Sequence, residues 1–462
     1  MKRFLALTVA VLLAAIMIGC SSSSNTLTTG AQPGNVFVTG EDAPLPSVVG
    51  FDVTINSITL NGASNSPEVV STPTTVDFAR LVGLRSPLAF NSVPADTYSS
   101  ATFVLTNPVI SFVDLTQNPP ALSTITGTLP TSPTYSLTVN FPTPMVVGAN
   151  GLAGLKMDFD IRQSLAVNGA GQVTGVVNPV IFVKATHASD PDGQVTDLTG
   201  GLVSVATASN SFVIQGPYGR QLTVYVNNNT TFNSGWSITN LAAPAIVGVQ
   251  GAFQADGSLM ASGVEVITTS QSFISGRLLA FTVNGSNQVQ QVTMWVGESG
   301  ADMVSDVDTI QTFDVSAVTD YEICFLDGPL TNALFNNTTL EIGQRIFIGG
   351  SFVNPVFTPQ MISLRRQGAY GMLVTGSVAV NNAPNGGNFQ LSNNGLLGYS
   401  AGGPVTVNTG NLTYFYDLNG LSALAADTTP VPIVARGLFL KDPISGNPEF
   451  YAGLVADPPL AQ

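Results

Sequence analysis

The stretch Val247-Gly248-Val249-Gln250-Gly251-Ala252-Phe253 decides the fold class, together with Val264-Glu265-Val266 just after it. Between them lies the turn-forming sequence Asp256-Gly257-Ser258-Leu259. Short runs rich in β-branched and aromatic residues, bounded by Gly, Asp and Asn, are typical of strands joined by tight turns. The same pattern continues in both directions without a long helical period. The sequence therefore predicts an all-β chain built of sandwiches or barrels.

The 247–253 stretch has two counterparts further along the chain, Arg345–Phe352 and Val434–Phe439. Their internal glycines, Gly251, Gly350 and Gly437, are 99 and 87 residues apart. Repeats of this length indicate tandem domains rather than solenoid turns. Glycine at such positions permits the sharp strand bending that a small closed barrel needs.

Each closing strand has an opening strand before it, near Gly201, Gly276 and Gly376. We therefore predict three OB-like β-barrel units, at residues 200–268, 273–366 and 370–458. The first unit resembles the bacterial domain of unknown function 5666, a family of exported proteins with an OB-like appearance. An OB-like barrel can bind oligonucleotides, but this chain shows no basic groove studded with aromatic residues.

Residues 34–186 carry strand patterns of their own and are predicted to form a β-sandwich-like domain. Asp42-Ala43-Pro44 stands near its start, and Val93-Pro94-Ala95-Asp96-Thr97-Tyr98 leads into a strand in its middle. These features resemble the bacterial domain of unknown function 4382, a family of exported β-rich domains. In that family a Gly is usual where this chain has Asp96-Thr97. The resemblance implies no known activity.

The amino terminus resembles the export signal of a bacterial lipoprotein. Lys2 and Arg3 precede an apolar run that ends in Met17-Ile18-Gly19-Cys20. The run is too short for a comfortable membrane span and matches a secretory signal peptide. The resemblance to a lipobox implies that residues 1–19 are removed and that Cys20 is acylated. An alternative is a simple export signal with an incidental Cys.

Acyl chains on Cys20 would make the membrane a partner of the chain without a spanning helix. Residues 20–33 are rich in Ser, Thr, Asn and Gly and are predicted to be a flexible tether. Ser21 and Ser22, rather than Asp, follow the Cys. By resemblance to enterobacterial sorting, this favours the outer membrane, in either the periplasmic or the surface-facing orientation.

The composition excludes several classes of function. Only 9% of the 462 residues are charged, against about 25% in an average soluble protein. The net charge of -14 argues against binding a nucleic-acid backbone. One His and two Cys argue against most zinc, haem and multi-His centres.

Residues suited to nucleophilic or acid–base catalysis are few. His187 lies near the first domain boundary, and no motif selects a Ser beside it, so we interpret it as a linker residue. Asp158 and Asp160 share one face of a strand, as catalytic carboxylates can, but Lys156 shares that face, as on a half-exposed strand. Cys324, in an apolar run, is predicted to be a buried thiol without a disulfide.

Two acidic loops are candidate cation sites. Asp190, Asp192 and Asp197 could offer oxygen ligands to Ca²⁺, although Asp-Pro-Asp-Gly is also an ordinary turn sequence. Residues 302, 306 and 308 form a second acidic loop of the same kind. No cofactor is otherwise expected.

Aromatic residues are candidates for stacking on sugars. Tyr414 and Tyr416 share one face of a strand, and Trp236 lies in the first barrel unit. The alternative is ordinary packing at a barrel rim, where Tyr and Trp keep a polar tip in solvent. Further aromatic candidates of this kind are Trp295, Tyr218, Tyr225 and Tyr399.

From the sequence we expect a non-catalytic cell-envelope lipoprotein that acts as a binding, adhesion or scaffold module, with an envelope protein or a glycan as its partner. A second hypothesis is a carbohydrate-binding lipoprotein that uses the aromatic residues. A third is an envelope hydrolase, which would need a Ser, Asp or His site in a pocket.

Overall fold

The computed structural model describes residues 32–456, with gaps at 44, 46, 82, 115–116, 118, 170–171, 217–218, 271, 327–329, 383–384, 393–402, 417, 428 and 443–444. The predicted signal peptide, the predicted lipidation site Cys20, most of the predicted tether, Pro44, Tyr218 and Tyr399 lie outside the described residues. Pro33–Gln462 form one compact unit. Its described part is built almost entirely of strands, which confirms the all-β prediction. None of the helices described is long and apolar enough to cross a membrane.

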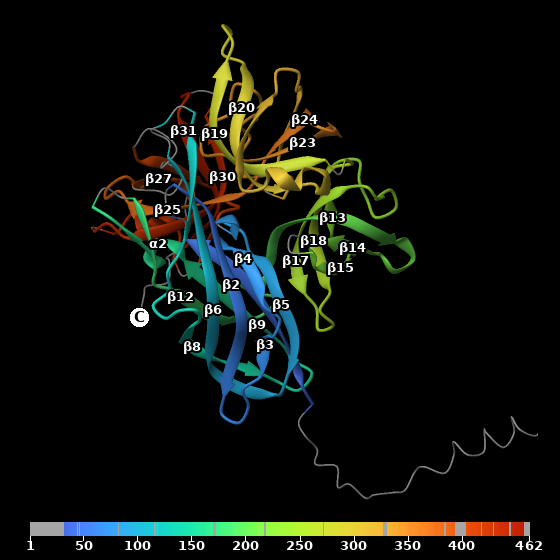
Figure 1. The fold of residues 1–462 in the computed structure, drawn as a ribbon, viewed down its shortest axis with the longest axis vertical. Helices are drawn as coiled ribbons and strands as arrows, with labels where there is room; N and C mark the ends of the chain where they lie inside the picture. Colours follow the sequence, from blue (N-terminus) through green and yellow to red (C-terminus); the bar gives the residue numbers. More distant parts are fainter. Residues whose placement is uncertain are drawn as a thin grey trace, which may run out of the picture. The chain divides into compact units, whose positions relative to one another are not determined.

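The N-terminal domain is a sandwich of two sheets (Figure 1, blue to blue-green). One sheet has the order β12-β9-β1-β5, from Ile181–Thr186, Leu152–Asp160, Gly34–Ala43 and Ser86–Val93. The other has the order β3-β2-β6-β7, from Glu68–Val70, Val48–Gly62, Asp96–Asp114 and Ala121–Thr126. Strands β4 (Thr74–Asp77) and β8 (Tyr135–Val147) pair with β2 and β6, and β10 (Leu165–Val167) pairs with β11 (Val173–Val177).

A single apolar core joins the two sheets of the sandwich. Phe51 of β2 and Phe159 of β9 meet edge to face, with ring centroids 5.2 Å apart. Alternate residues of the strands turn inward, as the period of two requires. Two short helical turns complete the domain, η1 (Phe78–Leu81) and α2 (Ile161–Ser164).

Three barrels follow the sandwich, each with its own core. The first contains β13 (Val195–Ala206), β14 (Ser211–Gln215), β15 (Gln221–Tyr225), β16 (Thr231–Phe232), β17 (Ile246–Phe253) and β18 (Leu259–Thr268). The second contains β19 (Phe273–Val283), β20 (Val289–Ser299), β21 (Thr309–Asp314), β22 (Asp320–Ile323), β23 (Arg345–Val353) and β24 (Val356–Leu364). The third contains β25 (Gln367–Leu373), β26 (Ala379–Asn382), β27 (Gly386–Ser392), β28 (Val405–Thr409), β29 (Tyr414–Tyr416), β30 (Pro432–Lys441) and β31 (Pro448–Ala456).

The barrels share one topology. The first has the strand order β15-β14-β13-β17-β18-β16, and the second repeats it as β21-β20-β19-β23-β24-β22. In the first two barrels, the first strand pairs with the second strand and with the penultimate strand. In the third barrel, β25 pairs with β27 and with the penultimate strand, β30. The last strand then pairs in parallel with a strand from the middle of the unit. Two further strand pairings close the sheets of the first and third barrels: β15 pairs with β18, and β25 pairs with β27.

The third barrel differs from expectation at its start. Its first strand is β25, which begins at Gln367, whereas residues 374–378 form a turn and its flanks. Gly376 lies in that turn with φ +76°, a conformation that favours glycine. The predicted opening strand at Gly376 is therefore wrong, because this glycine serves a turn and not a barrel strand.

The closing glycines have a common structural reason. The pairing register shifts at Gly251, Gly350 and Gly437, each time between the last two long strands of a barrel. A Cβ atom at any of the three would overlap a carbonyl oxygen of the partner strand, that of Met260, Thr358 or Tyr451. Such bulges bend a strand and increase its twist, which small barrels require.

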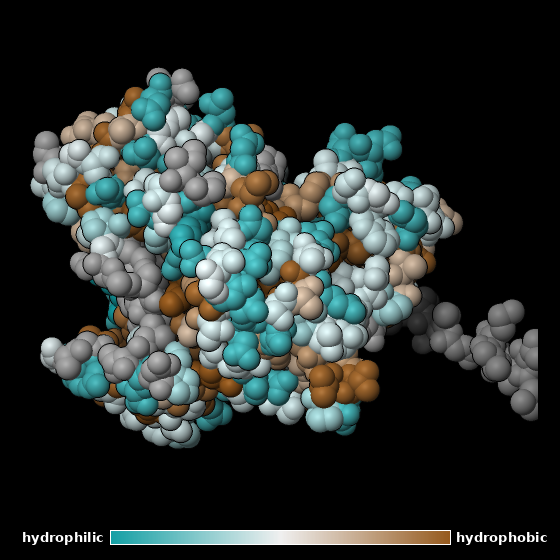
Figure 2. All heavy atoms as spheres, turned by 90° about the horizontal axis from the view of Figure 1, so that it is seen from above, coloured by the Kyte–Doolittle hydropathy of each residue, from teal (hydrophilic) through white to brown (hydrophobic). Residues whose placement is uncertain are grey.

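The surface mixes polar and apolar side chains. On the face drawn in Figure 2, hydrophobic residues lie among hydrophilic ones, as expected from the low content of charged residues. The most exposed large apolar side chains are those of Val353, Leu334, Val304 and Val146.

Replacement of a closing glycine tests the bulge. We expect Gly437→Ala to lower the stability by about 1–3 kcal/mol, because the new Cβ meets backbone that cannot move aside cheaply. The midpoint of urea unfolding measures this loss. Gly201→Ala is the matched control, because Gly201 also lies in a barrel strand but has no atom within 4 Å of its added Cβ. Equal midpoints for the two variants would contradict the role of the bulge.

Candidate functional site

Several charged residues of the described chain converge in two buried networks. The first surrounds Glu41 of β1, whose side chain is 1% exposed. Its carboxylate lies 2.7 Å from Lys156 Nζ of β9 and 2.8 Å from Arg436 Nη2 of β30. Arg85 Nε lies 3.4 Å away. One carboxylate of the sandwich therefore binds an arginine of the third barrel.

Asp192 extends the Glu41 network. It belongs to η2 (Pro191–Gly193), between the sandwich and the first barrel. Its carboxylate lies 3.1 Å from Lys156 Nζ, 3.4 Å from Arg85 Nη2 and 3.7 Å from Lys184 Nζ. Asp190 instead accepts a hydrogen bond from the backbone N–H of His187. The acidic loop is thus held by basic side chains and by its own backbone.

The network shifts the pKa values of its carboxyls in opposite directions. Burial disfavours the charged form of Glu41, but Arg436, Lys156 and Arg85 together hold its pKa well below the usual range. Burial, reinforced by the negative charge of Glu41, raises the pKa of Asp158 to about 7. Asp158 is therefore largely protonated below neutral pH while Glu41 stays ionised.

The second network joins the first two barrels around Arg365. Arg365 follows β24 of the second barrel and is 1% exposed. Its Nη1 donates to Glu265 Oε2 of β18 over 2.9 Å, and its Nη2 donates to Asp197 of β13. Arg345 Nη1, at the start of β23, lies 3.6 Å from the other oxygen of Asp197. Although burial disfavours its charge, the two carboxylates raise the pKa of Arg365 above its usual value.

A local irregularity of the backbone turns Asp197 inward. The pairing of β13 with β17 shifts register between Val195 and Leu198. Asp197 lies in this interval with φ +48°, in the left-handed region that Asp tolerates better than most residues. The side chain is buried as a result and faces the arginines of the second barrel.

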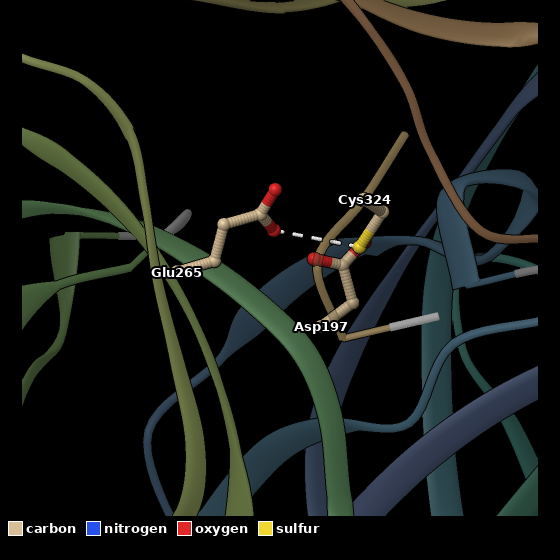
Figure 3. A group of neighbouring side chains, drawn as sticks. All are labelled: Asp197, Glu265 and Cys324. Carbon is tan, nitrogen blue, oxygen red and sulfur yellow. Dashed lines mark hydrogen bonds between the residues drawn. The ribbon is translucent and has the colours of Figure 1, made fainter. Parts of the chain in front are cut away.

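Asp197, Glu265 and Cys324 are the one group of metal-ligand type among the residues that the structure describes. Figure 3 shows the two carboxylates and the thiol turned toward one another, with Cys324 Sγ 3.4 Å from Glu265 Oε2. Two carboxylates and a thiol are a donor set that suits a divalent transition metal. Here the guanidinium of Arg365 already bonds both carboxylates, so the positive charge in this site comes from the protein.

The structure does not bring the three candidate calcium ligands together. Asp192 belongs to the Glu41 network and Asp197 to the Arg365 network, so the three predicted ligands do not converge. In the second acidic loop, Asp302 accepts a hydrogen bond from Ser272, and Asp306 accepts one from Gln311. The carboxylates of both loops thus form ion pairs or hydrogen bonds with other side chains of the protein. The sequence motif alone does not show these partners.

The aromatic candidates are only partly exposed. Tyr414 is 45% exposed and lies beside Tyr416, with ring centroids 6.3 Å apart. Lys184 Nζ and Lys156 Nζ lie 4.2 Å and 5.7 Å from the Tyr416 ring centroid, so cations cover that ring. Trp236 is half-buried against the core of the first barrel. Of the three, Tyr414 alone offers a largely open side chain.

Other singled-out residues serve the structure. Asp160 caps α2, because its carboxylate accepts hydrogen bonds from Gln163 N and Nε2. His187 is exposed and precedes η2. Cys324 is fully buried, as predicted.

A small pocket lies between the sandwich and the second barrel. Its volume is about 40 Å³. It is lined by side chains of both units: Trp295, Arg277, Arg345 and Glu298 from the barrel, and Asp42 and Arg80 from the sandwich. Arg80 Nη2 and Glu298 Oε2 form an ion pair of 2.8 Å across it. Next to the pocket, Val49 and Val113 pack against Leu279 and Trp295. We call it the Trp295 pocket.

Sequence reasoning did not single out the two networks. Their members are far apart in the chain: 168 residues separate Asp197 from Arg365. One signal was present, since the chain has only 14 Lys and Arg, and several of these lie within apolar strand patterns. A buried charge needs a partner, so such residues mark contacts between domains.

Comparison with known protein families gives two matches. Residues 34–174 match the model described as Domain of unknown function (DUF4382), and residues 193–265 match Domain of unknown function (DUF5666). Both resemblances seen in the sequence are thereby confirmed. Neither a curated protein nor a solved structure matches the chain.

Removal of the central arginine tests the second network. We expect Arg365→Met to destabilise the protein by about 3–5 kcal/mol, because Glu265 then remains buried without a counter-charge and Asp197 keeps only Arg345. Urea unfolding measures the change. Arg220→Met is the control: this arginine is exposed and donates a hydrogen bond to Thr74 Oγ1, so its loss should change the stability by no more than about 0.5 kcal/mol. A neutral effect of Arg365→Met would show that the pair is not needed.

The Asp158 carboxyl predicts a pH dependence. Its folded pKa of about 7 exceeds the unfolded value, so the folded state binds the extra proton and loses stability as pH rises toward 7. Glu41 contributes in the opposite sense, but its contribution is lost only at more acidic pH. The free energy of unfolding of the parent should therefore fall between about pH 5 and about pH 8. We expect this fall to be smaller in Asp158→Asn, by an amount on the order of 2 kcal/mol. Parallel pH profiles for the parent and the variant would refute this assignment.

Proposed function

We propose that the protein is a non-catalytic lipoprotein of the cell envelope that acts as a rigid scaffold or binding module. The observation that carries the proposal is that many of the few basic residues lie in contacts between domains. Six of its 14 basic residues enter the two buried networks: Arg85, Lys156, Lys184, Arg345, Arg365 and Arg436. These charges hold domains to one another.

The networks fit a scaffold because they fix how the domains are joined. The Glu41 network connects the sandwich with the third barrel, and the Arg365 network connects the first barrel with the second. Apolar contacts support the joint between the first two barrels, where Phe273 and Phe347 stack at 4.9 Å and pack with Ile246 and Ile267. Buried ion pairs tolerate little displacement, since separated charges in a low dielectric are costly.

The envelope location rests on the amino-terminal sequence. The lipobox-like Met17-Ile18-Gly19-Cys20 supports acylation at Cys20, followed by the polar tether before β1. Acyl chains would hold the body at a membrane, with the outer membrane favoured by Ser21 and Ser22. The partner in this proposal is another envelope component, a protein or a glycan.

Substitution of the acylated cysteine tests the anchor. We expect the parent chain to incorporate a fatty-acid label and to sediment with membranes, and Cys20→Ser to lose both properties, because the thiol is the attachment point. Labelling in the native host, followed by membrane fractionation, measures this. Cys324→Ser is the matched control and should keep the label, since Cys324 is fully buried.

Retention of the label by Cys20→Ser would overturn the proposed anchor, and so would a parent chain found only in the soluble fraction. Protease digestion of intact cells then distinguishes the two orientations. Digestion of the body while a periplasmic protein survives means that it faces outward, and protection means that it faces the periplasm.

A further inference from the structure

The Trp295 pocket contains hydrogen-bond donors that the protein does not satisfy. Trp295 is 3% exposed, and its Nε1 has no acceptor in the part of the chain that the structure describes. Leaving a buried N–H unpaired costs about 1–3 kcal/mol, so such a group calls for a partner from outside the chain. Trp295 belongs to the residues that line the pocket.

Arg345 supplies further donors. Within the described residues, the acceptors of its guanidinium are Arg366 O, 3.1 Å from Nη1, and the Asp197 carboxylate, 3.6 Å from the same nitrogen. Among the described residues, its Nε and Nη2 have no acceptor. A guanidinium carries five N–H donors in a planar fork that matches a carboxylate or another oxyanion.

Three arginines and two acids line the pocket. Arg80, Arg277 and Arg345 face Asp42 and Glu298, and Asp197, outside the lining, lies 3.6 Å from Arg345, so the charges around the pocket are close to balance. Glu298 is already paired with Arg80, and Asp42 Oδ1 accepts a hydrogen bond from Ile161 N. Both acids thus have partners in the protein.

Three further carboxyls lie near Arg80, outside the pocket lining: Asp52, Asp77 and Asp308. Burial is the main cause that raises the pKa of each of them. With its pKa raised to about 7, the Asp77 carboxyl is only partly ionised at neutral pH, so it opposes an anion less than a fully ionised group would.

The volume of the pocket limits the size of the ligand group. One water-sized group needs roughly 10–15 Å³ on this measure, so about 40 Å³ holds about three. A carboxylate has three heavy atoms and a phosphate has five. The pocket is partly open to solvent, which leaves room for the rest of a ligand to extend outward.

We propose that the Trp295 pocket binds the carboxylate group of a small organic acid, with Trp295 Nε1, Arg345 and Arg277 as its donors. This site goes beyond the scaffold role and does not depend on the lipid anchor. Loss of either proposal therefore leaves the other standing. A carboxylate bound there would contact both the sandwich and the second barrel.

Tryptophan fluorescence offers a direct test, because the chain has only two tryptophans. The full-length chain with Trp236→Phe reports on Trp295 alone. We expect acetate and formate, added at constant ionic strength, to change its emission saturably, and the neutral analogue acetamide to leave it unchanged. Arg277→Gln should weaken acetate binding about tenfold, the loss expected for one charge-assisted hydrogen bond. Arg220→Gln, away from the pocket, should keep the affinity within about twofold of the parent.

A second variant covers the case in which Arg277→Gln fails to fold. Trp295→Phe keeps an aromatic ring and removes Nε1, and we expect acetate to raise its melting temperature less than that of the parent. Four results would overturn the proposal: no saturable change, an equal response to acetamide, tighter binding of phosphate than of acetate, or full acetate affinity in both variants. The first of these would mean that water alone occupies the pocket.

Discussion

The architecture depends on the cost of burying charge. Arg365 lies almost without solvent contact between two carboxylates that belong to a different barrel. Removing such groups from water costs several kcal/mol for each ion, and only close pairing offsets this cost. Any other placement of the two barrels would leave at least one ion buried and alone. The main effect of the network is therefore to select one relative placement of the first and second barrels, and its contribution to net stability is small.

This specificity matters because the barrels are alike. The first two have the same strand order, and all three bulge at a closing glycine. Units with similar shapes and apolar surfaces can dock in the wrong combination as the chain folds. Charged residues that fit one partner exclude the others, because a mismatched pair leaves a buried charge. We infer that the few bases are concentrated at the joints for this reason.

The sequence predicted local features well and long-range ones poorly. Strand runs, turn residues and the closing glycines carry their signal within a few positions, so the all-β fold and the glycine of each closing strand were found. Gly376 misled the prediction because glycine serves a turn as readily as a bulge. Asp192 and Asp197 are neighbours in sequence, and the sequence alone therefore predicts them as ligands of one cation. Their true partners lie on other domains, and no local pattern distinguishes a carboxylate that binds a metal from one that binds an arginine.

The pairing of Glu41 with Arg436 has a consequence for how the chain is made. Glu41 lies in the first strand of the fold and Arg436 in the penultimate one. If the chain is exported from its amino terminus, the sandwich emerges long before its arginine partner does. Until then Glu41 is paired with Lys156 and Arg85 but lacks Arg436. The sandwich can therefore form its sheets while one buried carboxylate still lacks part of its counter-charge. A chain cut short before β30 would carry that defect permanently, and envelope proteases that act on loosened domains could thus tell a truncated product from a finished one.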